Sequence, residues 1–165
     1  SGVNRGANLA EDVMYSGTVA AAMEGALAGI PAIALSQRYA ETGMGDDVSF
    51  DAARSWGERV LRPVLDRPWV PGCVVNINFP PIAADQVKGV RVARQGVRDY
   101  GRARFERRDD PRGFPYYWLS LGRVDHAPEP GTDLAAIADG YVSVTPLHLD
   151  LTLDASLQAL RNAYL

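Results

Sequence analysis

The sequence predicts an α/β fold with a parallel central sheet. Short apolar runs at 31–36, 73–81 and 141–147 have the length of buried strands, and glycine or proline bounds each of them. Segments with apolar residues at helical spacing lie on either side of the first run, at 19–29 and at about 47–66. Such alternation of helix and apolar strand is typical of a parallel sheet covered by helices. With 165 residues, the chain is long enough for one domain with a sizeable core.

The two helices of the first half are predicted from their caps and their apolar faces. Ser16-Gly17-Thr18 is typical of a helix start, and Gly29 followed by Pro31 ends that helix. Its apolar face consists of Val19, Met23, Ala26, Leu27 and Ile30. The second helix, over about 47–66, is expected to use Asp46 or Asp47 as its N-cap. Its apolar face includes Ala52, Trp56, Val60 and Val64.

A protruding hairpin arm is predicted over 91–122. The alternating segment 88–97 predicts a half-exposed strand, and YYWLSLG at 116–122 predicts another strand. Between them lies a polar, arginine-rich segment with a turn at 110–113. Because one core cannot bury such a segment, the arm is predicted to be an oligomerisation element.

The C-terminal part adds a short helix, a strand and a second exposed appendage. The helix is expected at about 133–139, and the strand over 141–147 is expected to end at Pro146. An amphipathic helix over 154–164 follows, through Leu157, Leu160 and Tyr164. We therefore expect a single domain, 1–165, whose segment 148–165 also serves oligomerisation.

Charge and cysteine content exclude several classes of protein. The net charge of −3 gives no general attraction to nucleic acid or to a membrane. Cys73 is the only cysteine, which excludes an internal disulfide framework and a cysteine-based zinc site. No apolar run approaches 18 residues and no signal-peptide pattern opens the chain, so a reducing, cytoplasmic location is expected. The chain begins without methionine, which indicates a fragment, a processed chain or an incomplete record.

The opening segment, SGVNRGANLAEDVMYSGTVAAAMEG, has the features of a phosphate site beside a metal. Asn4 lies in a loop of small residues, and its amide oxygen is a hard ligand of the type that Mg²⁺ or Mn²⁺ accepts. Ser16 and Thr18 offer hydroxyl groups where the first helix begins, and the free N–H groups of a first turn favour an anion. A metal beside such a cradle indicates phosphoester hydrolysis. The same residues also suit a plain turn and a helix cap, and spacing alone leaves that alternative open.

Other motifs support weaker alternatives. A Ser-His hydrolase built on Ser16 would need a histidine, but GxSxG is absent, and structural roles are favoured for His126 and His148. GxGxxG and GxxxxGK[ST] are absent, which argues against a nucleotide cofactor. The segment from Arg91 to Arg112 contains eight arginines but also four acids, so contact with another subunit is favoured over nucleic acid.

The chain resembles the SurE family of survival proteins, which are acid phosphatases acting as 5′(3′)-nucleotidases. The motifs that carry the resemblance run in order along essentially all 165 residues: SGVNRGANLAEDVMYSGTVAAAMEG, GIPAIALS, VNINFP, KGVRV, DPRG before YYW, GTDLAAIADGYVSVTPL and HLDLT. The resemblance implies a Rossmann-like three-layer sandwich with an extended hairpin arm and a C-terminal helix. It also implies a nucleoside monophosphate as substrate and assembly into a homodimer or homotetramer.

Individual site residues follow from the same resemblance. Asn4 matches the family's asparagine ligand for one Mg or Mn ion, and Ser16, Gly17 and Thr18 match the turn that holds the substrate phosphate. Gly6 and Asn8 match the adjoining loop. The family's remaining metal ligands, an Asp-Asp pair and a serine, precede the SGVN motif, so neither they nor the opening strand–helix–strand portion is expected in this chain.

Two acidic pairs and one local departure from the family bear on that expectation. The adjacent acids Asp46-Asp47 and Asp109-Asp110 do not follow a strand and are not expected to replace the missing pair. Ala10 stands where the family commonly has glycine, so the loop is expected to differ slightly there. The alternative function is a non-catalytic oligomeric module that keeps the scaffold without the acids.

Overall fold

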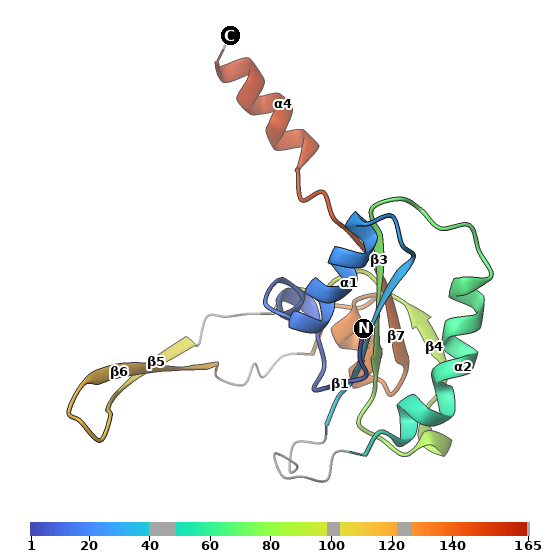
Figure 1. Ribbon diagram of the computed structural model, residues 1–165, viewed down its shortest axis with the longest axis horizontal. Helices are drawn as coiled ribbons and strands as arrows, with labels where there is room; N and C mark the ends of the chain where they lie inside the picture. The colour runs from blue at the N-terminus through green and yellow to red at the C-terminus, as the bar shows by residue number, and fades with distance from the viewer. Residues whose placement is uncertain (40–48, 99–102, 122–126, 165) are drawn as a thin grey trace.

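A central five-stranded sheet organises the described part of the chain, which in this computed structural model comprises residues 1–39, 49–98, 103–121 and 127–164 (Figure 1). The strand order is β1-β2-β3-β7-β4. The strands are β1 (Asn4–Arg5), β2 (Ala32–Gln37), β3 (Cys73–Phe79), β7 (Val142–His148) and β4 (Val90–Val92). The helices are α1 (Gly17–Leu27), α2 (Asp51–Leu65), α3 (Asp133–Ala138) and α4 (Asp154–Ala163), with 3-10 turns η1 (Ala10–Met14) and η2 (Ala84–Gln86).

Alternation along β3 divides the core into two layers. Val74 packs with Val19 and Ala22 of α1, whereas Ile77 packs with Ala52 and Val60 of α2. Because neighbouring side chains of a strand point to opposite faces, α1 and α2 cover opposite faces of the sheet. This arrangement confirms the predicted three-layer α/β sandwich.

The sheet is mixed, which corrects the expectation of a parallel one. Strands β1, β2 and β3 are parallel, but β7 runs antiparallel to β3 and parallel to β4. Strand β7 also continues past Pro146 to His148, so the expected end at Pro146 is wrong. The Val142 N–H and the Val144 carbonyl form hydrogen bonds with the segment that contains β4. The pairing of β4 with β7 ends at Val144. The nitrogen of Pro146 therefore faces a side where no strand of the described residues lies, and its missing N–H costs little there.

The positions predicted for α1 and α2 are confirmed within a few residues, and most residues of their predicted apolar faces are buried or partly buried. Helix α1 ends at Leu27, and the exposed fractions of Leu27 and Ile30 are 68% and 59%, so these two do not belong to its buried face. Helix α2 begins at Asp51 with Phe50 at the N-cap; Asp46 and Asp47 lie outside the described residues. Its predicted apolar face is confirmed, because Ala52 and Val60 are buried and Trp56 and Val64 pack against them.

The arm is a two-stranded antiparallel hairpin that extends away from the body (Figure 1). It consists of β5 (Ala103–Asp109), a strand missed from the sequence, and β6 (Pro115–Leu121). The predicted turn at 110–113 is confirmed, since the Asp110 carboxylate accepts from the backbone N–H of Arg112 and Phe114. The hairpin is shorter than the predicted 91–122, because β4 belongs to the central sheet and holds only three residues of the strand expected over 88–97.

Helix α4 also projects from the body, at the opposite side of the molecule from the carboxyl ends of β1 and β2 (Figure 1). None of its residues is buried, and Leu157 is the one partly covered side chain among its described residues. The described residues include no helix that combines the length and the apolar character needed to cross a bilayer.

Candidate functional site

The sequence-predicted residues lie at the carboxyl edge of the parallel strands. Strands β1, β2 and β3 end together there, at Arg5, Gln37 and Phe79. The chain leaves β1 through a loop and η1 and then enters α1, so the N-terminus of α1 lies at this same edge. Ligands of open α/β sheets bind in this position, between strand ends and helix N-termini.

Asn4 and Gly6 form one compact turn at the end of β1. The Asn4 side-chain nitrogen donates to the Gly6 carbonyl over 2.9 Å, and the Gly6 N–H donates to the Gln37 carbonyl over 2.9 Å. Gly6 has a φ of +112°, and a Cβ there would lie 3.2 Å from Cε1 of Tyr39, so the position requires glycine. No described hydrogen bond uses the Asn4 Oδ1 atom, and the half-buried amide can offer that oxygen to a ligand.

The turn at Ser16-Gly17-Thr18 caps α1 and leaves donors open. Ser16 Oγ accepts from the Val19 N–H at 3.1 Å, and the Ser16 carbonyl accepts from the Ala20 N–H. Among the described residues, no acceptor pairs with the N–H groups of Gly17 or Thr18. Nothing lies within 4 Å of a Cβ built on Gly17, so the backbone of this turn is open on that side. Free N–H groups and the helix dipole together favour an anion here.

Replacing Ser16 with alanine is expected to lower the free energy of unfolding by about 1 kcal/mol, because the Val19 N–H loses its acceptor. Urea unfolding followed by circular dichroism measures the change. Ser16→Asn, which keeps a capping oxygen, serves as the control and should stay close to wild type. Equal loss in both variants would show that the cap is not the cause.

Asn8 faces inward rather than toward solvent. It is buried, and its side-chain nitrogen donates to Ser36 Oγ over 2.7 Å. The side chain of Asn78 forms two hydrogen bonds with the backbone of Asn8. It accepts from the Asn8 N–H at 2.8 Å and donates to the Asn8 carbonyl at 3.0 Å. Asn76 donates to the same carbonyl, and its own Oδ1 atom is buried with no protein partner. In this geometry Asn8 anchors the loop to the sheet.

Asp133 ties the next part of the loop to two distant segments. Its fully buried carboxylate accepts from the N–H groups of Ala10, Gly96 and Leu134, at 2.9, 2.9 and 2.7 Å. Ala10 has a φ of +53°, a left-handed conformation that glycine adopts more easily. The alanine at this position, where the family resemblance predicts glycine, is therefore in a strained backbone conformation. The hydrogen bond to Asp133 helps to hold Ala10 in this conformation.

Comparison with known proteins identifies the family. The family model described as survival protein SurE matches residues 1–102. The chain belongs to the SurE family. A protein named 5′-nucleotidase SurE from Rhizorhabdus wittichii is 60% identical over 99% of this chain, and one of the same name from Erythrobacter litoralis is 52% identical over 97%. A crystal structure of the SurE protein from Aquifex aeolicus matches with a TM-score of 0.80 and 40% identity, covering 99% of this chain.

The comparisons confirm the resemblance and the SurE fold, and they also set the extent of the match. This chain spans 65% and 63% of the two curated relatives, and 64% of the Aquifex aeolicus chain.

The residues present supply only part of a SurE metal site. The amide oxygen of Asn4 is chemically suited to Mg²⁺ or Mn²⁺. The described residues contain no group of three or more histidine, cysteine or acidic side chains that could complete the coordination. Asp109 forms an ion pair with Arg107, and the Asp110 carboxylate accepts hydrogen bonds in the turn of the arm. One neutral ligand does not make a metal site, so the described residues alone do not fit a resident ion.

Among the described residues, neither His148 nor Cys73 offers a competing nucleophilic site. His148 pairs with Cys73 at the amino end of β3, whereas Ser16 lies at the carboxyl edge, which excludes a Ser16–His148 pair. The His148 Nδ1 atom contacts the Asp150 carbonyl instead. Burial raises the pKa of the Cys73 thiol, which keeps it in the unreactive protonated form at neutral pH. His126 lies outside the described residues.

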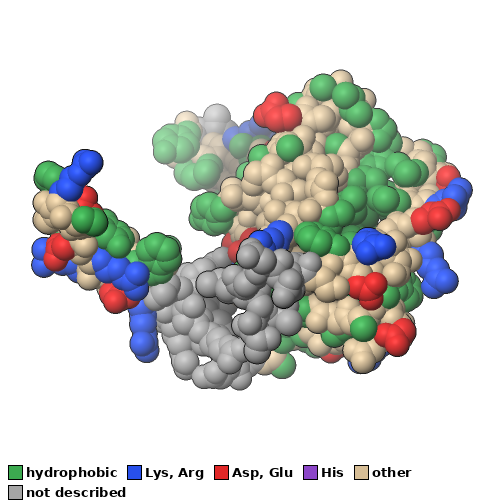
Figure 2. Space-filling model, turned by 60° about the horizontal axis from the view of Figure 1, so that its bottom comes forward, with side chains coloured by type: hydrophobic (Ala, Val, Ile, Leu, Met, Phe, Trp, Pro, Cys, Tyr) green, Lys and Arg blue, Asp and Glu red, His purple; other side chains and the backbone are tan. Residues whose placement is uncertain are grey.

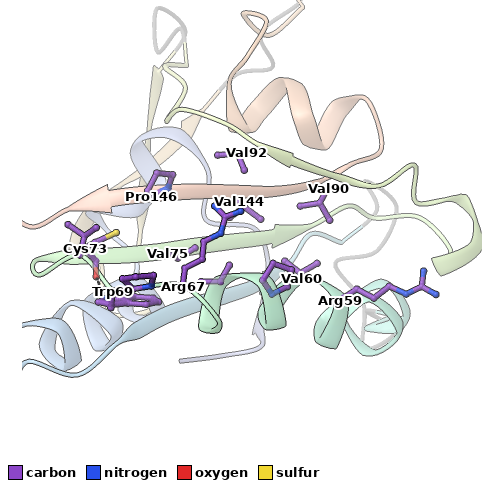
Figure 3. A pocket seen from close by; sticks show the side chains of 14 residues that line it. Arg59, Val60, Arg67, Trp69, Cys73, Val75, Val90, Val92, Val144 and Pro146 are labelled. Atoms are coloured by element: carbon purple, nitrogen blue, oxygen red, sulfur yellow. Dashed lines mark hydrogen bonds between the residues drawn. The ribbon is translucent and has the colours of Figure 1, made fainter.

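A pocket of about 560 Å³ lies on the α2 side of the sheet and is a different feature from the SurE site (Figure 3). Valines and prolines line most of it, Trp69 and Cys73 close one end, and Arg59 and Arg67 are its charged members. Because α1 covers the opposite face, this pocket does not reach the phosphate turn. It lacks the convergent polar groups that a phosphate ester needs.

Proposed function

We propose that this SurE chain contributes the substrate-holding part of a divalent-metal-dependent 5′(3′)-nucleotidase. Such an enzyme hydrolyses a nucleoside monophosphate to a nucleoside and phosphate. The observation that carries the proposal is the placement of the Asn4 amide and the open N–H groups of Gly17 and Thr18 at one edge of the sheet. The names of the relatives support the reaction type.

The chain's own residues perform binding and orientation in this proposal. The N–H groups of Gly17 and Thr18 and the Ser16 hydroxyl donate to the phosphoryl oxygens, which orients the phosphorus for attack by water. Gly6 lets the β1 turn approach the substrate closely, and Asn8 keeps the loop fixed on the sheet. Asn4 would be one ligand of a magnesium or manganese ion, which supplies positive charge to the phosphoryl group and activates water when bound.

We also propose that the arm and the C-terminal segment 148–165 contact other copies of the chain, in a homodimer or homotetramer. Phe105 and Tyr117 on the arm are 72% and 67% exposed, and an isolated two-stranded hairpin is marginally stable in water. Arginines on the arm pair with Asp109 and Glu106, and Figure 2 shows the two signs intermixed with apolar side chains. Such a surface suits a protein partner better than nucleic acid. A cytoplasmic location stays a prediction from the sequence.

Manganese-stimulated hydrolysis of a nucleoside monophosphate tests the function. Two proteins are compared: the 165-residue chain, and a chimera that joins Ser1 to the segment preceding the matched region in the Rhizorhabdus wittichii relative. The chimera should hydrolyse the substrate at least about 100-fold faster, because the metal contributes several kcal/mol to catalysis and the described residues hold it poorly.

The alternative, a non-catalytic oligomeric module, predicts a different result. In that case neither protein releases phosphate with manganese, although light scattering still reports an oligomer. An inactive but folded and oligomeric chimera would therefore overturn the nucleotidase proposal and favour the module.

A further inference from the structure

The segment 94–98, here called the arm root, runs from the central sheet toward the arm and crosses the 3-10 turn η1 on its way. Gln95 donates from its side-chain nitrogen to the Ala10 carbonyl over 2.9 Å. The Arg98 N–H donates to the Glu11 carboxylate over 2.8 Å, and the Arg98 guanidinium forms an ion pair with Asp12. Segments more than 80 residues apart in the sequence are thus joined by three polar contacts.

The other end of the arm root is fixed to the body. The Arg94 N–H donates to the Gly131 carbonyl, and the Arg94 carbonyl accepts from the Asp133 N–H. The Gly96 N–H donates to the Asp133 carboxylate, which also accepts from Ala10. The arm root and η1 therefore share one buried anchor, and the side chains of Gln95 and Arg98 add contacts farther out.

Along the chain, the turn η1 connects the anchored Asn8 to the phosphate turn. It closes with a hydrogen bond from the Tyr15 N–H to the Asp12 carbonyl, immediately before Ser16. Because η1 leads directly into Ser16, a displacement of Asp12 acts on the start of the first turn, while Val19 holds the inner side of that turn against the sheet. The Arg98–Asp12 pair is positioned to resist that displacement, since its side chains are only 28% and 32% exposed and water screens the pair less than a surface pair.

We propose that the arm root positions the anion-binding turn of this chain, with Arg98 and Gln95 as the positioning residues. The phosphate titration described below rests on the proposed function. The effect of the arm root on the order of η1 does not rest on it. Neither side chain needs to touch substrate, because both act through the backbone of η1.

The experiment uses the whole 165-residue chain and the variants R98A, Q95A and the double variant R98A/Q95A. R98K keeps a positive charge and is the rescue variant. R94A is the matched control, because Arg94 also belongs to the arm root but forms its ion pair with Glu129, which lies outside η1. Urea unfolding verifies that each variant is folded before comparison.

The first measurement is hydrogen exchange at the Tyr15 amide, which donates inside η1. We expect exchange to become about tenfold faster in R98A/Q95A, intermediate in R98K, and unchanged in R94A. If the Tyr15 amide of the folded double variant exchanged at the same rate as in wild type, the proposal would be overturned.

The second measurement is titration with inorganic phosphate, followed by the amide chemical shifts of Gly17 and Thr18. The Kd for phosphate should rise about fivefold or more in R98A/Q95A, and R98K should lie between that value and wild type. An unchanged Kd would also overturn the proposal. Absence of any phosphate shift in wild type would instead count against the proposed function, and the Tyr15 exchange would then decide the positioning role by itself.

Discussion

Replacing Asp133 with alanine is expected to destabilise the chain by about 3 to 5 kcal/mol. The variant removes the acceptor of three backbone N–H groups, those of Ala10, Gly96 and Leu134. The carboxylate is fully buried, and each buried donor left without a partner costs about 1 to 3 kcal/mol. Ala10 would in addition lose a bond that holds its left-handed backbone. The free energy of unfolding in urea, measured by circular dichroism, tests the expectation.

Two further variants make this measurement specific. Asp139→Ala removes an exposed acid that pairs with Arg91, and its effect should stay below about 1 kcal/mol. Asp133→Asn keeps one acceptor oxygen and should lose about half as much stability as the alanine variant. A free energy of unfolding for Asp133→Ala within 1 kcal/mol of wild type would show that these N–H groups find other partners.

The fold was predictable where local pattern and tertiary packing agree. The apolar spacing of α2 and the buried runs of β2 and β3 identified those elements within a few residues. The direction of β7 was not predictable, because its apolar pattern is the same whether it pairs parallel or antiparallel with β3. The strand β5 was missed because its side chains are mostly charged and face solvent, so no burial pattern marks it.

The candidate site was predictable only where it uses short-range motifs. Asn4 and the turn at Ser16 lie near each other in the sequence, and the structure gives both an available polar group. The anchors of the intervening loop, Asn78 and Asp133, come from positions 70 and 123 residues away. One signal could have indicated Asn78: two asparagines alternate with apolar residues in VNINF, which places both on one face of a buried strand. No pattern in the sequence paired Arg98 with Asp12.

Replacing Asn4 with alanine is expected to weaken manganese binding by at least about tenfold in the chimera proposed above. The variant removes the one neutral oxygen that this chain is proposed to give the ion, and losing even an outer-sphere partner of a metal commonly costs 10- to 100-fold in affinity. Isothermal titration with manganese measures the affinity, and phosphate release measures the rate. The rate should fall at low manganese and recover in part when manganese is raised, because binding of the ion is the step that is impaired.

The design separates metal loss from damage to the fold. Asn4→Ala also removes the hydrogen bond to the Gly6 carbonyl, so a loss of about 1 kcal/mol in stability is expected and is measured alongside. Asn4→Asp keeps an oxygen at the same position and adds a charge, so it should retain manganese binding. Asn162→Ala, on the exposed helix α4, is the control for removing an asparagine elsewhere and should leave the manganese affinity unchanged. If Asn4→Ala left both affinity and turnover intact, Asn4 would not be a ligand, and the carboxyl edge of β1 would lose its proposed role in catalysis.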